Sequence, residues 1–291
     1  MPNFDDVFTS KGMPDENFDA GAWAQKKQAE RDGVFSLLDT SAQRLSQPAA
    51  LRSYLDVQSR MMNLSANNAL LVSAQCPDAT KLATFDDWRK QRATVNSGEK
   101  AISILSQGSS YKRDDGTEGH YTDIGKVFDV SQTDAPQTAA EVTPPDPRTL
   151  LSSLSSHQCA AIELSDNMPD KKVAQYNPEN NTIYVRRGVD PANLFRSITI
   201  ELATAQLCRD GSSPRDNGAA AYAASYMLCG KYGIDNRGYS VEQLAKSFSG
   251  IDAKTIRDQI GKARNAAESI SYQMEKTIHP QQRSEKETKP R

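Results

Sequence analysis

A proline-rich segment near the middle of the chain limits which folds are open to it. Pro136, Pro144, Pro145 and Pro147 lie within residues 132–149, among Thr, Ala and Asp residues. Proline lacks a backbone N–H and has a fixed φ, so such a segment cannot run through a helix interior or a central strand. We therefore predict a linker at 132–149 that separates a first part, residues 19–131, from a second part, residues 150–278.

The two ends of the chain are polar, and the composition is that of a globular protein. Residues 1–18 and 279–291 have few apolar side chains, and we expect both to be disordered. Hydrophobic residues make up 37% of the 291 residues, which is enough to bury cores. No stretch approaches the ~20 apolar residues of a membrane-spanning helix. The first residues also lack the basic and apolar regions of a secretory signal, which predicts a cytoplasmic protein without membrane contacts.

The hydrophobic periodicity predicts an α+β fold. For the first part it predicts helices over residues 19–47, 48–62 and 66–75, a short helix after an N-cap at Thr84, and strands near 101–104 and 122–130 joined by a polar loop. For the second part it predicts a helix over 150–162, a hairpin over 173–185, and helices over 191–207, 217–231, 241–248 and 254–276. The expected architecture is N-terminal helices with a small antiparallel sheet, followed by a mostly helical part with a β-hairpin edge.

The charge distribution allows nucleic-acid binding only through a local patch. The chain has 35 Lys and Arg against 37 Asp and Glu, so its overall field is not positive. Residues 52–113 nevertheless hold nine Lys and Arg against five acidic residues. Cationic groups along the backbone and aromatic faces that stack bases are what single-stranded DNA requires. Candidate contacts from this segment are Tyr54, Arg60, Trp88, Arg89, Lys90, Arg92, Lys100 and Tyr111, with Lys100 the first choice for a backbone contact.

The helix predicted over 191–207 holds a segment that can be compared with zinc peptidases. Their active-site helix carries His-Glu-x-x-His, in which two histidines one turn apart hold Zn²⁺ and the glutamate activates the bound water. The five residues from Ile200 to Thr204 keep the glutamate, Glu201, but have Ile and Thr where the histidines would be.

The chain resembles the ArdC-type antirestriction family in both parts. In the second part the resemblance rests on AQYNPENNTIYVRR, SITIELATAQL and AYAASYMLCGKYGID. In the first part it covers about residues 54–133 and rests on the ordered strings NALL, PDAT, TFDDW and VNSGEKAI. The resemblance implies a first domain that binds single-stranded DNA and a second, zincin-like domain with a metallopeptidase scaffold.

The sequence departs from that family where the metal would bind. Ile200 has no lone pair to donate, and the hydroxyl of Thr204 is a poor zinc ligand. The third ligand expected near residues 217–221 is replaced by Asn, Gly and Ala residues, and only Asp216 lies nearby. The histidines at 120, 157 and 279 are isolated, and the four cysteines at 76, 159, 208 and 229 form no CxxC pair. We therefore expect no metal and no cofactor, with Glu201 a vestige of a catalytic base.

The resulting hypothesis is a mobile-element accessory protein that binds single-stranded DNA and has a catalytically inactive peptidase-like domain. Two alternatives stay open at this point. One is a peptidase with an unconventional site, and the other is a protein-interaction or inhibitory module. The latter would hold a partner peptide in the zincin-like cleft, by strand addition along residues 182–187 near Tyr184.

Overall fold

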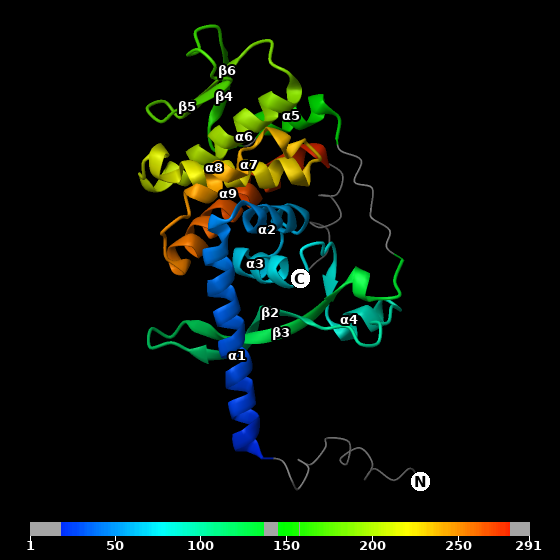
Figure 1. Cartoon of the computed structure of the whole chain (residues 1–291). Helices are drawn as coiled ribbons and strands as arrows, with labels where there is room; N and C mark the ends of the chain where they lie inside the picture. Colours follow the sequence, from blue (N-terminus) through cyan, green and yellow to red (C-terminus); the bar gives the residue numbers. More distant parts are fainter. Residues whose placement is uncertain (1–18, 137–144, 157, 280–291) are drawn as a thin grey trace.

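The structure is a computed structural model that describes residues 19–136, 145–156 and 158–279, and its class is α+β, as predicted (Figure 1). The first part contains α1 (Ala20–Gln43), α2 (Pro48–Arg60), α3 (Ala66–Gln75), β1 (Leu82–Ala83), α4 (Phe85–Lys90), β2 (Ile102–Lys112) and β3 (Glu118–Asp129). The second part contains α5 (Pro147–Ser155), β4 (Ala161–Ser165), β5 (Ala174–Asn177), β6 (Thr182–Arg186), α6 (Pro191–Leu207), α7 (Pro214–Lys231), α8 (Val241–Lys246) and α9 (Ala253–Ile278).

Local capping signals set where the helices begin. The Ser65 side chain accepts the N–H of Asn68 at the start of α3, and the Thr84 side chain accepts the N–H of Asp87 at the start of α4. Asp190 caps α6, with proline in its first turn, where the missing N–H is not needed. The predicted bounds 66–75 and 191–207 and the predicted N-cap at Thr84 are therefore confirmed.

The first sheet is antiparallel, with strand order β1-β3-β2. The prediction of a polar loop between β2 and β3 is wrong. β2 extends to Lys112 and β3 begins at Glu118, so only a short turn joins the two strands. Both faces of this part of the hairpin are largely exposed, so its sequence lacks the alternating apolar pattern that identifies a strand. In Figure 1 the hairpin extends past α1 and away from the rest of the molecule.

The second sheet has strand order β4-β6-β5. The predicted hairpin is confirmed as β5 and β6, which are antiparallel, but the helix predicted over 150–162 ends at Ser155. Residues 161–165 instead form β4, which pairs in parallel with β6. Such pairing joins segments that are distant in sequence, so a local periodicity cannot reveal it.

One hydrophobic core extends through both parts of the chain. Helix α2 packs against α7, and helix α3 packs against α9 (Figure 1). The Tyr226 hydroxyl on α7 donates to the carboxylate of Asp56 on α2, at 2.8 Å. The halves on either side of the linker are therefore packed together, and the boundaries at 19–131 and 150–278 stay a prediction from sequence.

The described ends of the predicted linker are ordered. Thr133 forms a bridge with Val95, and Pro147 lies in the first turn of α5. Residues 137–144, and the ends 1–18 and 280–291 that we expect to be disordered, lie outside the described residues. Within the described part of the chain, no helix is long and apolar enough to cross a membrane.

Candidate functional site

The segment that corresponds to a zinc-binding motif lies on α6, facing the edge strand β5. The carboxylate of Glu201 accepts the backbone N–H of Tyr176 on β5, with 2.8 Å between Oε2 and N. Burial raises the pKa of Glu201, and the Tyr176 hydrogen bond and the nearby Lys172 offset only part of this effect. Glu201 therefore holds a helix to the edge of a sheet.

Ile200 and Thr204, which stand where a zinc peptidase has its two histidines, offer no metal ligand. The hydroxyl of Thr204 is buried and donates to the carbonyl oxygen of Ile200 in its own helix, at 2.9 Å. The amide of Asn217, where a third ligand is expected, is buried and donates to the Ser212 hydroxyl at 2.6 Å. In residues 19–136, 145–156 and 158–279, no three His, Cys, Asp or Glu side chains are grouped so that they could hold a metal ion.

The two histidines that the structure describes do not supply the missing ligands. His120 is exposed on β3, and His279 lies 3.6 Å from Glu275 at the end of α9. His157 lies outside the described residues. The four cysteines are free thiols.

Strand addition along residues 182–187 is contradicted by the sheet order. β6 lies in the centre of its sheet, paired with β4 on one side and with β5 on the other. Its backbone hydrogen bonds are thus satisfied, and a partner peptide cannot extend the sheet there. The hydroxyl of Tyr184 accepts a hydrogen bond from the Asn180 amide in the adjoining turn. On the edge strand β5, the N–H of Tyr176 is occupied by Glu201.

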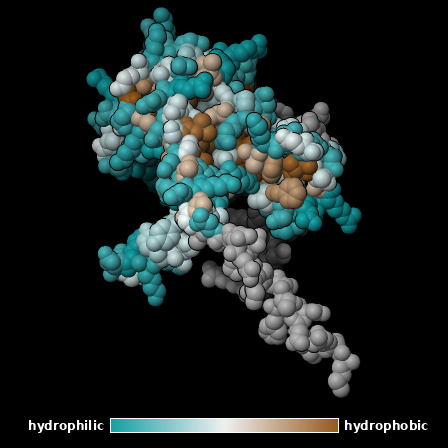
Figure 2. Space-filling model, turned by 60° about the horizontal axis from the view of Figure 1, so that its bottom comes forward, coloured by the Kyte–Doolittle hydropathy of each residue, from teal (hydrophilic) through white to brown (hydrophobic). Residues whose placement is uncertain are grey.

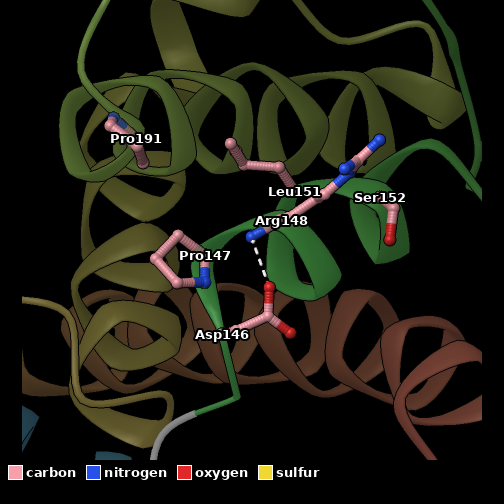
Figure 3. Close-up of a pocket in the computed structure, with 6 residues that line it drawn as sticks. All are labelled: Asp146, Pro147, Arg148, Leu151, Ser152 and Pro191. Carbon is pink, nitrogen blue, oxygen red and sulfur yellow. Dashed lines mark hydrogen bonds between the residues drawn. The ribbon is translucent and has the colours of Figure 1, made fainter.

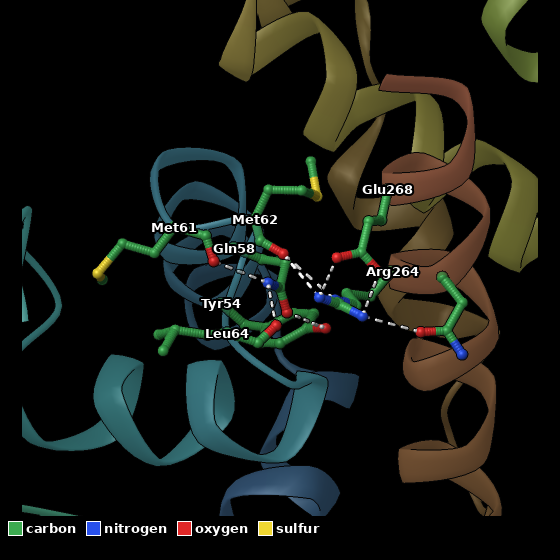
Figure 4. Close-up of polar contacts among 8 residues, drawn as sticks. Tyr54, Gln58, Met61, Met62, Leu64, Arg264 and Glu268 are labelled. Carbon is green, nitrogen blue, oxygen red and sulfur yellow. Dashed lines mark hydrogen bonds and ion pairs between the residues drawn. The ribbon is translucent and has the colours of Figure 1, made fainter. Parts of the chain in front are cut away.

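Two of the three aromatic rings predicted to stack on bases, those of Tyr54 and Trp88, are buried. The expectation that these two rings are exposed is therefore wrong. Tyr54 on α2 is 0% exposed, and its hydroxyl donates to Gln58 at 3.4 Å (Figure 4). Trp88 on α4 is 1% exposed, and its Nε1 donates to the carbonyl oxygen of Phe128 at 3.0 Å. Both rings face the core because helices α2 and α4 turn their apolar sides inward, and neither ring can reach a nucleobase.

The cationic side chains predicted to contact DNA are exposed, but some of them already bind other groups of the protein. Arg60 donates to the carbonyl oxygens of Ala79 and Pro77, which ties down the loop after α3. Lys90 forms an ion pair with Asp87 at 2.7 Å. The remaining three predicted cations, Arg89, Arg92 and Lys100, have exposed side chains.

The third predicted ring, Tyr111, is exposed and has a partner that sequence reasoning missed. Tyr111 on β2 and Tyr121 on β3 have ring centroids 4.7 Å apart, tilted by 40°. Their side chains are 39% and 57% exposed. They lie on the distal part of the β2–β3 hairpin, residues 106–123, which we call the arm. The sequence offered one signal for this pair, a second tyrosine at position 121. The sequence prediction placed Tyr121 in a loop, so it did not pair the two rings.

The backbone of the arm explains why the two rings meet. Tyr111 pairs with Gly119, so Tyr121, two residues further along β3, is its diagonal neighbour on the same face. A β-bulge between Gln107 and Ser110 adjusts the register opposite Tyr121. Gly119 has no side chain, and a Cβ there would lie 2.7 Å from Cζ of Tyr111. The glycine therefore leaves the space that the Tyr111 ring occupies.

The arm itself is not basic. Residues 106–123 contain two cations, Lys112 and Arg113, and four carboxylates, those of Asp114, Asp115, Glu118 and Asp123. Arg113 also donates to the hydroxyl of Thr117 and to a backbone carbonyl within the turn. The arm can thus offer aromatic faces, while cations for phosphate groups must come from elsewhere in the molecule.

Two side-chain amides of α3 hold the part of β2 that leads into the arm. Asn68 donates to the carbonyl oxygen of Leu105 at 2.9 Å and accepts its N–H at 2.8 Å. Gln75 makes the same pair of contacts with Ser103, both at 2.9 Å. These amides imitate the hydrogen bonds of a neighbouring strand. Arg31 of α1 also donates to the carbonyl oxygen of Thr122 in the arm, so α3 and α1 together fix the direction of the arm.

A hollow beside the start of α5 is lined by Asp146, Pro147, Arg148, Leu151, Ser152 and Pro191 (Figure 3). The Asp146 carboxylate caps α5 by accepting the N–H groups of Arg148 and Thr149. The Ser152 hydroxyl donates to the carbonyl oxygen of Thr149. Because these polar groups are engaged within the helix, little is left to fix a ligand, and we assign none. The face in Figure 2 is mostly hydrophilic, with apolar residues in small separate patches.

Two solved structures are similar to this chain. The metal-free crystal structure of the antirestriction protein ArdC from plasmid R388 gives a TM-score of 0.50 at 18% identity, over 72% of this chain and 84% of that chain. The Mn(II)-bound structure of the same protein gives a TM-score of 0.50 at 17% identity, over 76% and 97%. No family model and no curated protein matches the sequence. The resemblance to ArdC expected from the sequence is therefore confirmed at the level of the fold.

Proposed function

From the fold shared with ArdC, we propose that this protein binds single-stranded DNA through the arm, while its peptidase-like second part performs no hydrolysis. The observation that carries the proposal is the exposed ring pair of Tyr111 and Tyr121. Unpaired bases stack on exposed aromatic faces, and stacking tolerates any sequence because every base has a π-face. ArdC is an antirestriction protein of a plasmid, so we assign this chain to the accessory proteins of mobile elements.

The geometry around Glu201 supports the absence of hydrolysis. A general base must reach the water or proton that it takes up, at about 3 Å. Here the carboxylate is hydrogen-bonded to the Tyr176 backbone, and neither Ile200 nor Thr204 can hold a metal that would activate water. A scaffold of this kind retains the packing of an enzyme without its reaction.

The test measures binding of the full chain to a short labelled oligothymidine by fluorescence anisotropy at low salt. We expect Tyr111→Ala and Tyr121→Ala each to weaken binding by about 1–3 kcal/mol, the usual contribution of one stacked base. Tyr272→Ala is the matched control, because Tyr272 is a 63% exposed tyrosine on α9, outside the arm. Absence of binding by the wild-type chain, or equal affinities for all three variants, would refute the proposal.

A parallel assay addresses the second half of the proposal. Wild-type protein purified with added Zn²⁺ or Mn²⁺ is incubated with a denatured protein substrate, and cleavage is followed by electrophoresis. We expect no cleavage. Cleavage that disappears in Glu201→Gln would instead establish an unconventional peptidase.

A further inference from the structure

A surface groove runs between the beginning of α3 and the first half of α9. Its lining includes four cations, Lys254, Arg257, Lys262 and Arg264, and one carboxylate, Asp258. One wall thus comes from the first part of the chain and the other from its last helix. The excess of positive charge differs from the chain as a whole, which has a net charge of −2.

Two of the cations fix the walls of the groove. Arg264 donates through Nη2 and Nε to the carbonyl oxygen of Met62, at 3.0 and 3.3 Å, and forms an ion pair with Glu268 at 2.6 Å (Figure 4). Arg257 pairs with Asp39 of α1 at 3.1 Å. These contacts join α9 to the turn after α2 and to α1, so the width of the groove is set by the folded core.

The other two cations, Lys254 and Lys262, are exposed in the groove. They lie eight residues apart on one helix, a separation of about 12 Å along its axis. Among the described residues, neither ammonium forms a hydrogen bond or an ion pair. The nearby Asp210 carboxyl has its pKa lowered mainly by hydrogen bonds from Ser212, with a smaller contribution from Lys262. When Asp39, Glu268 and Asp210 are counted with the groove, four carboxylates balance its four cations, and Lys254 and Lys262 are the two cations whose ammonium groups form no ion pair among the described residues.

Gly261 offers an open position in the lining of the groove. It lies inside α9 between the two lysines, it lines the groove, and no atom lies within 4 Å of the position that its Cβ would take. Glycine in a helix interior costs about 1 kcal/mol relative to alanine, and no packing contact requires it here. The position can therefore accept a side chain without displacing any described protein atom.

The groove and the arm are connected through α3. Residues 65–67 at the beginning of α3 line the groove, while Asn68 and Gln75 of the same helix hold the base of the arm. The arm provides aromatic faces but has more carboxylates than cations, and the groove provides cations without exposed aromatic rings in its lining. Single-strand binding requires both kinds of group.

We infer that this groove binds the sugar–phosphate backbone of the same single strand whose bases stack on the arm. The inference rests on the proposed function and extends it, because it assigns DNA contacts to α9, in the part of the chain that resembles a peptidase. Lys254 and Lys262 are the phosphate-contacting residues, and Gly261 lies between them on the same helix.

The experiment changes the charge in the groove without removing any existing contact. Gly261→Lys, Gly261→Gln and Gly261→Glu are made in the full chain, and affinity for oligothymidine is measured by anisotropy at several salt concentrations. Each substitution replaces a helical glycine in open space, so each leaves the fold at least as stable. We expect Gly261→Lys to tighten binding and Gly261→Glu to weaken it, each by about threefold to tenfold, with Gly261→Gln between them.

The salt dependence identifies the binding as electrostatic. For single strands, the slope of log affinity against log salt changes by about 0.7 for each phosphate group that the protein neutralises. We therefore expect a steeper slope for Gly261→Lys and a shallower slope for the double variant Lys254→Gln with Lys262→Gln.

Ser152→Lys and Ser152→Glu are the matched controls, since Ser152 is an exposed position on α5 and these variants introduce a charge of either sign outside the groove. Gly261 variants that bind like the wild type, or no differently from the Ser152 variants, would overturn the groove assignment and leave arm binding intact. A wild-type chain that binds no oligothymidine would refute the proposed function and this inference together.

Discussion

The Glu201 carboxylate on α6 accepts the backbone N–H of Tyr176 on β5 at 2.8 Å, which joins a helix to the open edge of a sheet. Glu201→Ala removes the acceptor, and we expect a loss of about 1–3 kcal/mol in the free energy of unfolding, the usual cost of an unpaired buried group. Glu201→Gln keeps an acceptor oxygen and should retain most of the stability. Urea unfolding of the three proteins checks this, and equal stability of all three would contradict a structural role.

The same carboxylate makes stability depend on pH. Burial raises the pKa of Glu201 above its ordinary value of 4.5, so the folded chain holds this proton more tightly than the unfolded chain. This contribution is complete below pH 4.5 and is lost as the pH rises through the raised pKa. We expect the unfolding free energy of wild type minus that of Glu201→Gln to fall over this range. Parallel urea titrations measure the difference, and one that is independent of pH would contradict the raised pKa.

Trp88 is predicted to act through the core and not through DNA. Its ring is 1% exposed, and its Nε1 donates to the carbonyl oxygen of Phe128. We expect Trp88→Ala to destabilise the protein by about 3–5 kcal/mol, as is usual for truncating a buried aromatic residue. Trp88→Phe, which retains most of the volume, should bind oligothymidine with wild-type affinity. A large loss of affinity by a folded Trp88→Phe protein would show that this ring does contact DNA.

Gly119→Ala tests the position of the Tyr111 ring without removing either tyrosine. The new methyl group would lie 2.7 Å from Cζ of Tyr111, and the end of a side chain can move away more easily than backbone can. We therefore expect normal stability and a measurable loss of oligothymidine affinity, up to the ~1–3 kcal/mol of one stacked base. Anisotropy and thermal unfolding are measured on one preparation. Unchanged affinity would mean that the ring pair does not bind bases.

Asp129 is predicted to make the first sheet sensitive to acid. Burial alone would raise its pKa, but hydrogen bonds from Ser131, Lys81 and Thr80 outweigh burial and hold the pKa below its ordinary value of 3.8. Its stabilisation is therefore present above pH 3.8 and lost as the pH falls through the lowered pKa. Asp129→Ala should cost about 2–4 kcal/mol near neutral pH and less in acid. Urea unfolding at several pH values measures this, and a cost that does not fall in acid would contradict the lowered pKa.

Local sequence predicted the parts of the fold whose causes are local. Thr84 is an N-cap because its side chain reaches the N–H group of Asp87 three residues ahead, and this contact depends on nothing else in the chain. The lack of metal-ligand chemistry at Ile200 and Thr204 follows in the same way from the side chains themselves. Whether the protein binds a metal elsewhere, and whether it binds DNA, stay predictions for the experiments above.

Local sequence was thus sufficient for the starts of α3, α4 and α6, for the α+β class and for the chemical character of each candidate side chain. It was not sufficient for the starts of α5 and α7, which lie three residues before the predicted positions 150 and 217. Only the folded chain shows that Tyr54 and Trp88 face the core, that Tyr121 lies against Tyr111, and that β4 pairs with β6. The difference comes from distance along the chain. Burial and pairing depend on groups that are far apart in sequence, and only the folded backbone brings them within contact.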